Sequence, residues 1–206
     1  MNKKAIFFDL DNTIYPVAAI GDELFEPVVS LIAVSEEFTG ERAALEEMLR
    51  RKPFHYVAGH YKLSDTLKDQ VVKALQELIC NVVIHPFPGY AVVKSLPQRK
   101  FLVTAGFTKL QLSKLTQLGI EYDFDGIYII DHSVSDETKK SKFTEIMAAN
   151  NFAPVDILVV GDDPASEIRA AKELGIDAVL YDSLALYGDM EETPKINGLA
   201  DLINFV

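Results

Sequence analysis

The sequence predicts an α/β fold in which a doubly wound, Rossmann-like parallel sheet forms the core and a small all-α domain is inserted after the first strand. Five short apolar runs support this prediction, because they are continuous rather than alternating, as in parallel strands that helices cover on both faces. They are Ala5–Phe8, Lys100–Thr104, Gly126–Ile130, Ile157–Val160 and Ala178–Tyr181. Helical patterns separate the last four runs, and such alternation favours right-handed crossovers within one parallel sheet.

Three helices are predicted between these strands, over residues 108–118, 141–150 and 165–174. Gly119 and Gly175 follow the first and the last of them, where a left-handed C-terminal residue favours glycine. Beyond the last strand, the acidic cluster at 189–192 and Pro194 indicate a surface loop. Residues 198–205 are expected to form a short closing helix or strand.

One long segment, residues 17–83, shows helical patterns and no pattern that predicts a strand. Two helices are expected over residues 23–38 and 41–52, and a third begins at Ser64, a residue type that caps helices. The apolar stripe of this third helix consists of Leu67, Val71, Leu75 and Leu78. We therefore expect residues 17–83 to form a helical domain inserted into an α/β core of residues 1–16 and 84–206.

Composition and charge narrow the class of protein and its partners. The chain has 206 residues, of which 49% are hydrophobic and 25% are charged, as in ordinary globular proteins. The formal net charge of −11 argues against a nucleic-acid polymer as the main partner, because such proteins need a basic surface. Cys80 is the only cysteine, which excludes an intrachain disulfide, and no apolar run is long enough to span a bilayer. We expect a cytoplasmic protein without a membrane partner, either a monomer or a homodimer.

The first candidate site is the pair of acids that follows the first apolar run, in Phe7-Phe8-Asp9-Leu10-Asp11-Asn12-Thr13. Open α/β sheets bind their ligands at the carboxyl ends of the strands, where Asp9 and Asp11 would lie. Two carboxylates this close repel each other unless a cation or a shared proton relieves them. Mg²⁺ would do so, because it is a hard cation that prefers oxygen ligands. Taken alone, the two acids could equally begin a turn or cap the next element.

A second acidic pair follows the fourth apolar run, in Val159-Val160-Gly161-Asp162-Asp163-Pro164, and Glu167 comes one turn later. Helix capping explains Asp163 and Glu167 well, because acidic side chains are favoured in a first turn. It explains Asp162 less well, because this residue is at the strand end itself. Acid pairs at two separate strand ends together predict one metal site.

Two weaker signals indicate a phosphate. Val103-Thr104-Ala105-Gly106 places a hydroxyl group at a strand end, where Thr104 and nearby backbone N–H groups could hold an anion, although a helix cap or tight turn explains the same residues. Thr138-Lys139-Lys140-Ser141-Lys142 places cations at the start of a helix, where the helix dipole disfavours them. That position favours one functional lysine, with the other two in solvent.

In this order, the four signals resemble the motifs of the haloacid dehalogenase-like superfamily. The first motif of that family is a hydrophobic strand followed by D-x-D-x-T, which Asp9-Leu10-Asp11-Asn12-Thr13 matches, and Gly161-Asp162 matches the last acidic motif. The resemblance covers residues 4–15 and 87–180. The helical segment between the first motif and Thr104 looks like the family's helical cap in its first insertion position.

The resemblance implies a role for three of the acids. Asp9 would attack the phosphorus and ligate Mg²⁺. Asp11 would protonate the leaving oxygen, then help to deprotonate the hydrolytic water, and its backbone carbonyl would contact the metal. Asp162 would complete the metal ligands. Glu167 stands where Asp is common in the family, so either Glu167 or Asp163 could assist this site.

The resemblance also implies groups that bind the substrate. Thr104 would hydrogen-bond the transferring phosphoryl group, although Ala105 follows it where the family often has Asn. Lys139 would neutralise charge around Asp9; its spacing to Gly161 favours it over Lys140, the second candidate. Asn12, Ala105 and Lys140 are expected beside the substrate.

These residues together predict a Mg²⁺-dependent phosphatase that hydrolyses a small phosphorylated metabolite, such as a nucleotide or a sugar phosphate, through an aspartyl-phosphate. A phosphomutase would use the same core residues. A dehalogenase needs neither a metal nor a second acid, so Asp11 argues against it. A non-catalytic binding protein on this fold is disfavoured by the complete acidic set.

Overall fold

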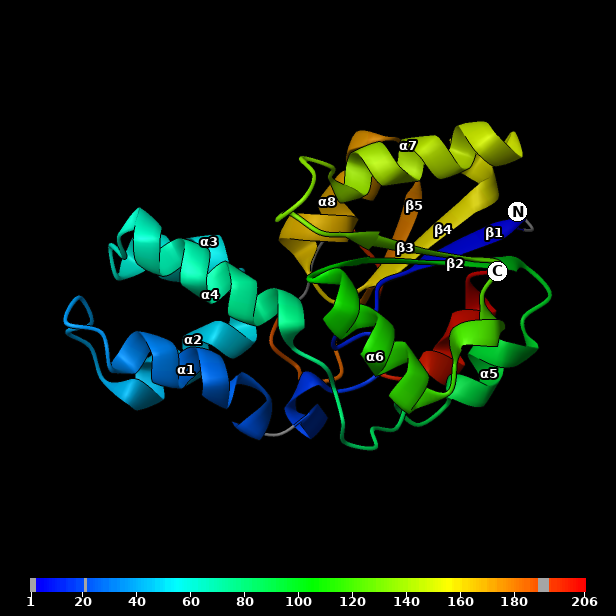
Figure 1. Cartoon of the computed structure of the whole chain (residues 1–206). Helices are drawn as coiled ribbons and strands as arrows, with labels where there is room; N and C mark the ends of the chain where they lie inside the picture. Colours follow the sequence, from blue (N-terminus) through cyan, green and yellow to red (C-terminus); the bar gives the residue numbers. More distant parts are fainter. Residues whose placement is uncertain (1–2, 21, 189–192) are drawn as a thin grey trace.

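The computed structural model describes residues 3–20, 22–188 and 193–206. In these residues six strands form one sheet in the order β3-β2-β1-β4-β5-β6, and every neighbouring pair is parallel (Figure 1). The strands are β1 (Ala5–Phe8), β2 (Arg99–Ala105), β3 (Gly126–Ile130), β4 (Ile157–Gly161), β5 (Asp177–Tyr181) and β6 (Lys195–Ile196). This order is that of a doubly wound, Rossmann-like sheet, so the predicted fold class is confirmed.

Strand β1 lies inside the sheet and is buried from both faces. The parallel register pairs Phe8 with Leu102 of β2 and with Val160 of β4. Ile6 belongs to one apolar core and Phe7 to the other, because successive side chains of a strand point to opposite faces. The continuous apolar composition of β1 follows from this burial on two sides.

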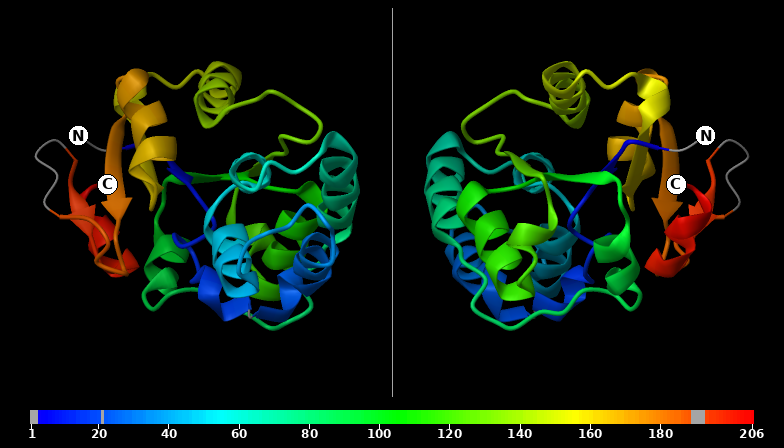
Figure 2. Two further views of the ribbon diagram at one scale, coloured as in Figure 1. Left: turned by 90° about the vertical axis from the view of Figure 1, so that its left-hand side faces the viewer. Right: turned by 90° about the vertical axis from the view of Figure 1, so that its right-hand side faces the viewer.

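Helices cover both faces of the sheet, as two directions of view show (Figure 2). On one face lie α7 (Lys139–Asn150) and α8 (Arg169–Glu173), and on the other lie α5 (Tyr90–Ser95) and α6 (Thr108–Leu118). A 3₁₀ helix at Leu199–Asn204 packs against α5 and closes the chain. The expected helix or strand at residues 198–205 is therefore a helix.

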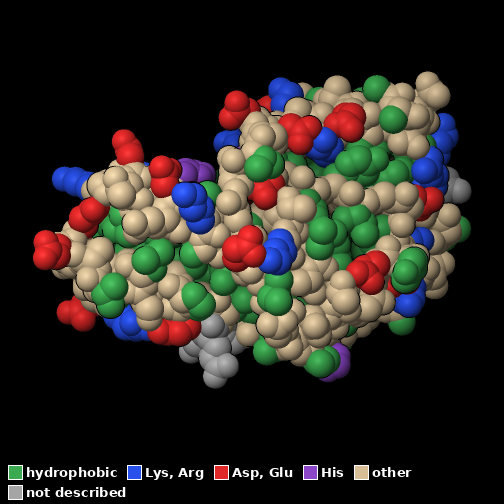
Figure 3. Space-filling model, viewed as in Figure 1, with side chains coloured by type: hydrophobic (Ala, Val, Ile, Leu, Met, Phe, Trp, Pro, Cys, Tyr) green, Lys and Arg blue, Asp and Glu red, His purple; other side chains and the backbone are tan. Residues whose placement is uncertain are grey.

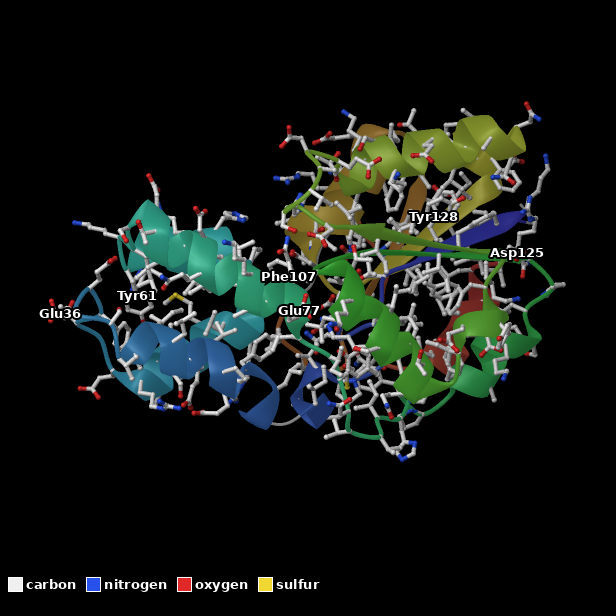
Figure 4. The ribbon with its side chains drawn as sticks, viewed as in Figure 1. Glu36, Tyr61, Glu77, Phe107, Asp125 and Tyr128 are labelled. Atoms are coloured by element: carbon white, nitrogen blue, oxygen red, sulfur yellow. The ribbon has the colours of Figure 1, made fainter. Side chains whose placement is uncertain are left out.

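Four α-helices lie in the described part of residues 17–83, between β1 and α5. They are α1 (Glu26–Ala33), α2 (Arg42–Arg51), α3 (Phe54–His60) and α4 (Asp65–Glu77). Their buried apolar residues include Ile32, Leu45, Val57 and Val71. Helix α4 meets α6 of the core, where Glu77 pairs with Lys109; Figure 4 draws Glu77 and Phe107 at this junction.

The structure differs from the predicted elements at several places. The helix expected to reach residue 38 ends at Ala33, and Leu78 follows α4 rather than belonging to it. Among the α-helices and strands of the described residues, three are additional to the predicted ones: α3, α5 and β6. These three are short, with seven, six and two residues, so none of them offers a full period pattern. The loop expected at residues 189–192 lies outside the described residues.

The predicted helix ends are largely confirmed. Helix α6 spans the predicted residues, and Gly119 and Gly175 have positive φ angles of 64° and 69°. Helix α7 begins at Lys139, two residues before the predicted start, because Thr138 and Ser141 form a capping box. The Ser141 N–H donates to Thr138 Oγ1 at 3.1 Å, and the Thr138 N–H donates to Ser141 Oγ at 2.8 Å.

Charged side chains of both signs are interspersed over the face of the molecule seen in Figure 3. None of the helices in the described part of the chain is both long and apolar enough to cross a lipid bilayer.

The capping box gives a prediction about stability. Thr138→Ala removes the side-chain acceptor for the Ser141 N–H, so we expect the free energy of unfolding to fall by about 1 kcal/mol. Thr144→Ala is the matched control, because its hydroxyl only donates to the Lys140 carbonyl within the same helix. We expect the control to change stability by less than about 0.5 kcal/mol. Urea denaturation measures both, and equal losses would contradict the capping role.

Candidate active site

The end of β1 places Asp9 at the carboxyl edge of the sheet. The Asp9 N–H donates to the Val160 carbonyl at 3.0 Å, which continues the pairing of β1 with β4 by one residue. The Asp9 residue is 7% exposed, so its carboxyl group is nearly withdrawn from water. Because β4 is the parallel neighbour of β1 and ends at Gly161, Asp162 reaches the same edge.

Three acids gather at this edge. Asp9, Asp162 and Glu167 each place one carboxylate oxygen within 4.8 Å of the other two. Glu167 comes from a π-helical turn at Pro164–Ile168, just before α8. Lys139, from the first turn of α7, forms ion pairs with Asp9 and with Glu167, the second at 2.7 Å. The Lys139 ammonium group thus joins Asp9 to Glu167.

The electrostatics of this group follow from its burial. Loss of water raises the pKa of Asp9 to about 7, although the Lys139 ammonium group opposes the rise. Burial, together with the charges of Asp9 and Glu167, raises the pKa of Asp162 to about 8. Burial disfavours the charged form of Lys139, but the two carboxylates outweigh it and its pKa is raised. When all three acids are ionised they carry more negative charge than the one lysine neutralises, and the raised pKa values of Asp9 and Asp162 reflect this.

The donor set fits a hard divalent cation. Three carboxylates in contact range and a single ammonium group leave an excess of negative charge in a largely buried space. Carboxylate oxygens are the ligands that Mg²⁺ prefers, and a cation relieves the repulsion that raises the pKa values of Asp9 and Asp162. Asp9, Asp162 and Glu167 are the side chains of the described residues that could hold it.

Glu167 and Asp163, the two acids left open by the sequence, have different surroundings. Glu167 is 1% exposed and contacts Lys139. Asp163 is exposed, and its carboxylate accepts from the Ala165 N–H at 2.8 Å, as a helix cap does. The Asp163 N–H donates to Glu167 Oε1 at 2.8 Å. Asp163 thus supports the turn that carries Glu167.

The carboxylate of Asp11 is turned towards α6. Lys114 Nζ lies 2.8 and 3.0 Å from its two oxygens, Gln111 Nε2 lies 2.9 Å from Oδ2, and the Tyr15 hydroxyl group donates to Oδ1. Burial tends to raise the pKa of Asp11, but the charge of Lys114 and the hydrogen bonds from all three side chains lower it overall. The arrangement favours an ionised Asp11, which must gain a proton before it can act as an acid.

Thr104 lies at the end of β2 and is 1% exposed. Its Oγ1 accepts a hydrogen bond from Gln111 Nε2 at 2.7 Å, so Gln111 connects Thr104 with Asp11. Ala105 is exposed and is the last residue of β2, with its carbonyl 3.3 Å from the same amide nitrogen. Gly106 follows with φ +152°, and its N–H donates to the Ile130 carbonyl.

The two remaining predicted residues lie at the margin of this site. Asn12 has a left-handed backbone with φ 56°, and its Oδ1 accepts from the Val17 N–H at 3.1 Å. Its side chain therefore closes the turn that follows β1. Lys140 pairs with Glu173 at 2.9 Å, so Lys139 is the member of the lysine pair that contacts Asp9.

Sequence reasoning missed Gln111, Lys114 and Tyr15. A usable signal existed on α6, where the helical period places Gln111 and Lys114 next to the apolar stripe of Leu110 and Leu115. A lysine on the buried side of a helix needs a polar partner, because an unpaired buried charge is costly. Tyr15 carried no such signal.

The fold and these groups define a Rossmann-like α/β protein with an acidic site at the ends of its central strands. The chain belongs to the haloacid dehalogenase-like hydrolase family, whose sequence pattern matches residues 3–175. The family suggested by the first and last acidic motifs is therefore confirmed.

Two curated relatives match over nearly the whole chain. A glyceraldehyde 3-phosphate phosphatase of Methanothermobacter thermautotrophicus is 25% identical over 210 residues, which cover 95% of this chain and 92% of the relative. A protein of the same name from Methanopyrus kandleri is 24% identical over 206 residues, with 91% and 87% covered.

Solved structures of similar proteins support the fold. The HAD-hydrolase YfnB of Bacillus subtilis, in a crystal form bound to magnesium, superposes with a TM-score of 0.64 at 18% identity and covers 100% of this chain and 99% of its own. An L-2-haloacid dehalogenase of Xanthobacter autotrophicus has a TM-score of 0.61 at 15% identity, with 98% of each chain covered. At these sequence identities, the similarity shows a shared fold and nothing about activity.

The contact between Gly161 and Glu167 gives a prediction. A Cβ atom at Gly161 would lie 2.1 Å from Glu167 Cγ and 2.3 Å from Oε1, so Gly161→Ala must displace Glu167. We expect the free energy of unfolding to fall by about 1–3 kcal/mol, as in overpacked cores.

Gly59→Ala is the matched control, because a Cβ there meets no atom within 4 Å and the residue lies within α3. We expect it to stabilise by about 0.5–1 kcal/mol. Chemical denaturation of the two variants measures the difference; a neutral Gly161→Ala would show that Glu167 can move without cost.

Proposed function

We propose that this protein is a Mg²⁺-dependent phosphatase that hydrolyses a small phosphorylated metabolite through an aspartyl-phosphate on Asp9. One observation carries the proposal: Asp9 is a buried carboxylate at the end of β1, in contact with Lys139 and grouped with Asp162 and Glu167. The curated names of two relatives, both phosphatases of glyceraldehyde 3-phosphate, support it.

Asp9 is the proposed nucleophile. One of its carboxylate oxygens forms a bond to phosphorus while the bond from phosphorus to the leaving oxygen breaks, and the leaving oxygen takes a proton from Asp11. In the second half of the reaction, Asp11 takes a proton from the water that attacks phosphorus, and the bond to Asp9 breaks with release of phosphate. Dividing the transfer through a covalent step replaces one difficult displacement by two easier ones.

Binding of the phosphoryl group is assigned to residues at the same edge. The Thr104 hydroxyl group and backbone N–H groups at the end of β2, including that of Ala105, would hydrogen-bond its oxygens. Lys139 would offset the negative charge that collects between Asp9 and the phosphate. Asn12 and Lys140 stay predicted neighbours of the substrate. Positioning and charge stabilisation are the main requirements of phosphoryl transfer.

Mg²⁺ would be held by Asp9, the backbone carbonyl of Asp11 and Asp162, with Glu167 beside them. When bound, it supplies positive charge that lets an anionic nucleophile approach an anionic phosphate. The protein would hold these ligand oxygens close together in a largely buried site.

Residues 17–83 are proposed to act as a cap domain that selects the substrate. Helices α1 to α4 follow the acid pair directly in the chain and contact the core through α4 and α6. Glyceraldehyde 3-phosphate is the first substrate to test, because both curated relatives bear its name. Nucleotide and sugar phosphates complete the panel, and product analysis of the sugar phosphates separates a phosphatase from a phosphomutase.

The proposed nucleophile is tested by Asp9→Asn. We expect wild-type protein with Mg²⁺ to release phosphate from p-nitrophenyl phosphate and from at least one metabolite of the panel. Asp9→Asn should lower kcat on the order of a thousandfold or more, because a neutral amide replaces the attacking carboxylate. Asp201→Asn, an exposed acid in the last 3₁₀ helix, should leave kcat unchanged. Equal activity of Asp9→Asn and wild type would refute the proposal.

The raised pKa values predict how pH acts on metal binding. Below about pH 7 to 8, Asp9 and Asp162 keep protons that Mg²⁺ must displace. We expect the apparent affinity for Mg²⁺ to increase from pH 6 to pH 8.5, with protons released on binding. Titration calorimetry in buffers of different ionisation enthalpy measures the released protons, and a pH-independent affinity would contradict the assignment.

The same shifts act on stability without metal. Because the pKa of Asp162 rises from 3.8 to about 8, the folded chain binds a proton that the unfolded chain has lost between these values, so stability falls as pH rises through this window. We expect Asp162→Asn to raise the metal-free Tm at pH 8 and to have a smaller effect at pH 5. Thermal unfolding with a chelator at both pH values measures this. A lower Tm for Asp162→Asn than for wild type at pH 8 would contradict the prediction.

A further inference from the structure

Helix α6 carries two buried polar side chains that both point to the acid after the nucleophile. Gln111 is 1% exposed and Lys114 is 6% exposed, although both belong to a helix with an exposed opposite side. Lys114 Nζ contacts both carboxylate oxygens of Asp11, and Gln111 Nε2 contacts one of them. The cluster therefore lies beside the acids that surround Lys139 but is built from different residues.

The chemistry of its neighbours determines how the Gln111 amide is oriented. Gln111 Nε2 lies within hydrogen-bond distance of three oxygen atoms: Asp11 Oδ2, the Ala105 carbonyl and Thr104 Oγ1. An ionised carboxylate and a carbonyl oxygen can only accept hydrogen bonds, so the end of the Gln111 amide that faces them is its NH₂ group. By donating to Thr104 Oγ1, the amide leaves the hydroxyl hydrogen of Thr104 free to point elsewhere.

The backbone is shaped to admit this amide. Gly106 has φ +152°, and a Cβ atom there would lie 3.0 Å from Gln111 Cδ and 3.2 Å from Nε2. On the other side, Tyr15 is fully buried, donates to Asp11, and has its ring centroid 6.0 Å from Lys114 Nζ. Asp11 is thus held by donors from α6 and from its own turn.

We propose that Gln111 and Lys114 are positioning residues: Gln111 orients the Thr104 hydroxyl group towards the phosphoryl oxygens and, with Lys114, keeps the Asp11 carboxyl group placed for proton transfer. The inference deepens the proposed phosphatase function and rests on it. Neither residue exchanges atoms with the substrate. The proton passes between Asp11 and the leaving oxygen, and the phosphoryl group passes to Asp9.

Two aryl phosphates of similar shape isolate this role. Nitrophenolate is a weak base and leaves without a proton, whereas phenolate is a stronger base and depends more on proton donation by Asp11. The ratio of kcat/KM for phenyl phosphate to that for p-nitrophenyl phosphate therefore reports on the placement of Asp11. A general loss of folded enzyme or of phosphate binding lowers both values and leaves this ratio unchanged.

Gln111→Leu is the main variant, because it removes the amide donor without changing charge and with little change in size. We expect it to lower the ratio about tenfold, a part of the 10² to 10⁴ that general acid catalysis contributes. Gln117→Leu, in the last turn of the same helix, should keep the wild-type ratio. Thermal unfolding of both variants monitors folding. An unchanged ratio in Gln111→Leu overturns its role in placing Asp11, and an unchanged kcat/KM for p-nitrophenyl phosphate overturns its role in orienting the Thr104 hydroxyl group.

Lys114 is tested by Lys114→Met and Lys114→Arg, with Lys94→Met on α5 as the matched control. We expect Lys114→Met to lower the ratio about tenfold and Lys114→Arg, which can still contact both oxygens, to recover most of it. A ratio that is unchanged or raised in Lys114→Met overturns the positioning role of Lys114. Wild-type enzyme that hydrolyses neither phosphate refutes the proposed function itself, which is a different outcome.

Discussion

The repulsion among three carboxylates at the end of the central strands is the constraint around which this structure is organised. Asp9 and Glu167 are buried, Asp162 is partly buried, and Lys139 is the lysine of the described residues that contacts two of the three. Such a group costs stability in the folded chain, because ionised acids are favoured in water and disfavoured when buried together. Acids with strongly shifted pKa values cluster at functional sites, which is why this group is the candidate active site.

The parallel sheet brings these side chains together at one edge. Strands β1, β2 and β4 end at one edge because they run in the same direction. Their register pairs Phe8 of β1 with Leu102 of β2 and with Val160 of β4. Asp9, Thr104 and Asp162 therefore come together although about a hundred and fifty residues separate the first from the last. The helices that follow β2 and precede β4 then add Gln111, Lys114 and Lys139 from either side. Core packing thus positions the groups that repel one another.

Much of this arrangement was readable from the sequence, because its signals were local. The apolar runs predicted five strands, and the acids that followed two of them predicted where a site would form. The left-handed glycines at 119 and 175 marked helix ends because only the local backbone decides that preference. In contrast, α3, α5 and β6 depend on tertiary partners: Tyr90 and Val93 of α5 are buried in the core, and β6 exists through its pairing with β5. Gln111 and Lys114 were missed because their meaning lies in a partner about a hundred residues away.

The close packing of Gly161 against Glu167 has a consequence for how this chain can change. The longer acid at 167 occupies the volume that a side chain at 161 would need, so the two positions are coupled through shape. Shortening Glu167 to Asp would keep a carbon at the Cγ position, the atom that would lie 2.1 Å from a Cβ atom at residue 161, so the shorter acid alone would not make room for a side chain there. A lineage that enlarged residue 161 would therefore also have to turn the side chain at 167 elsewhere, and the two positions could change only together.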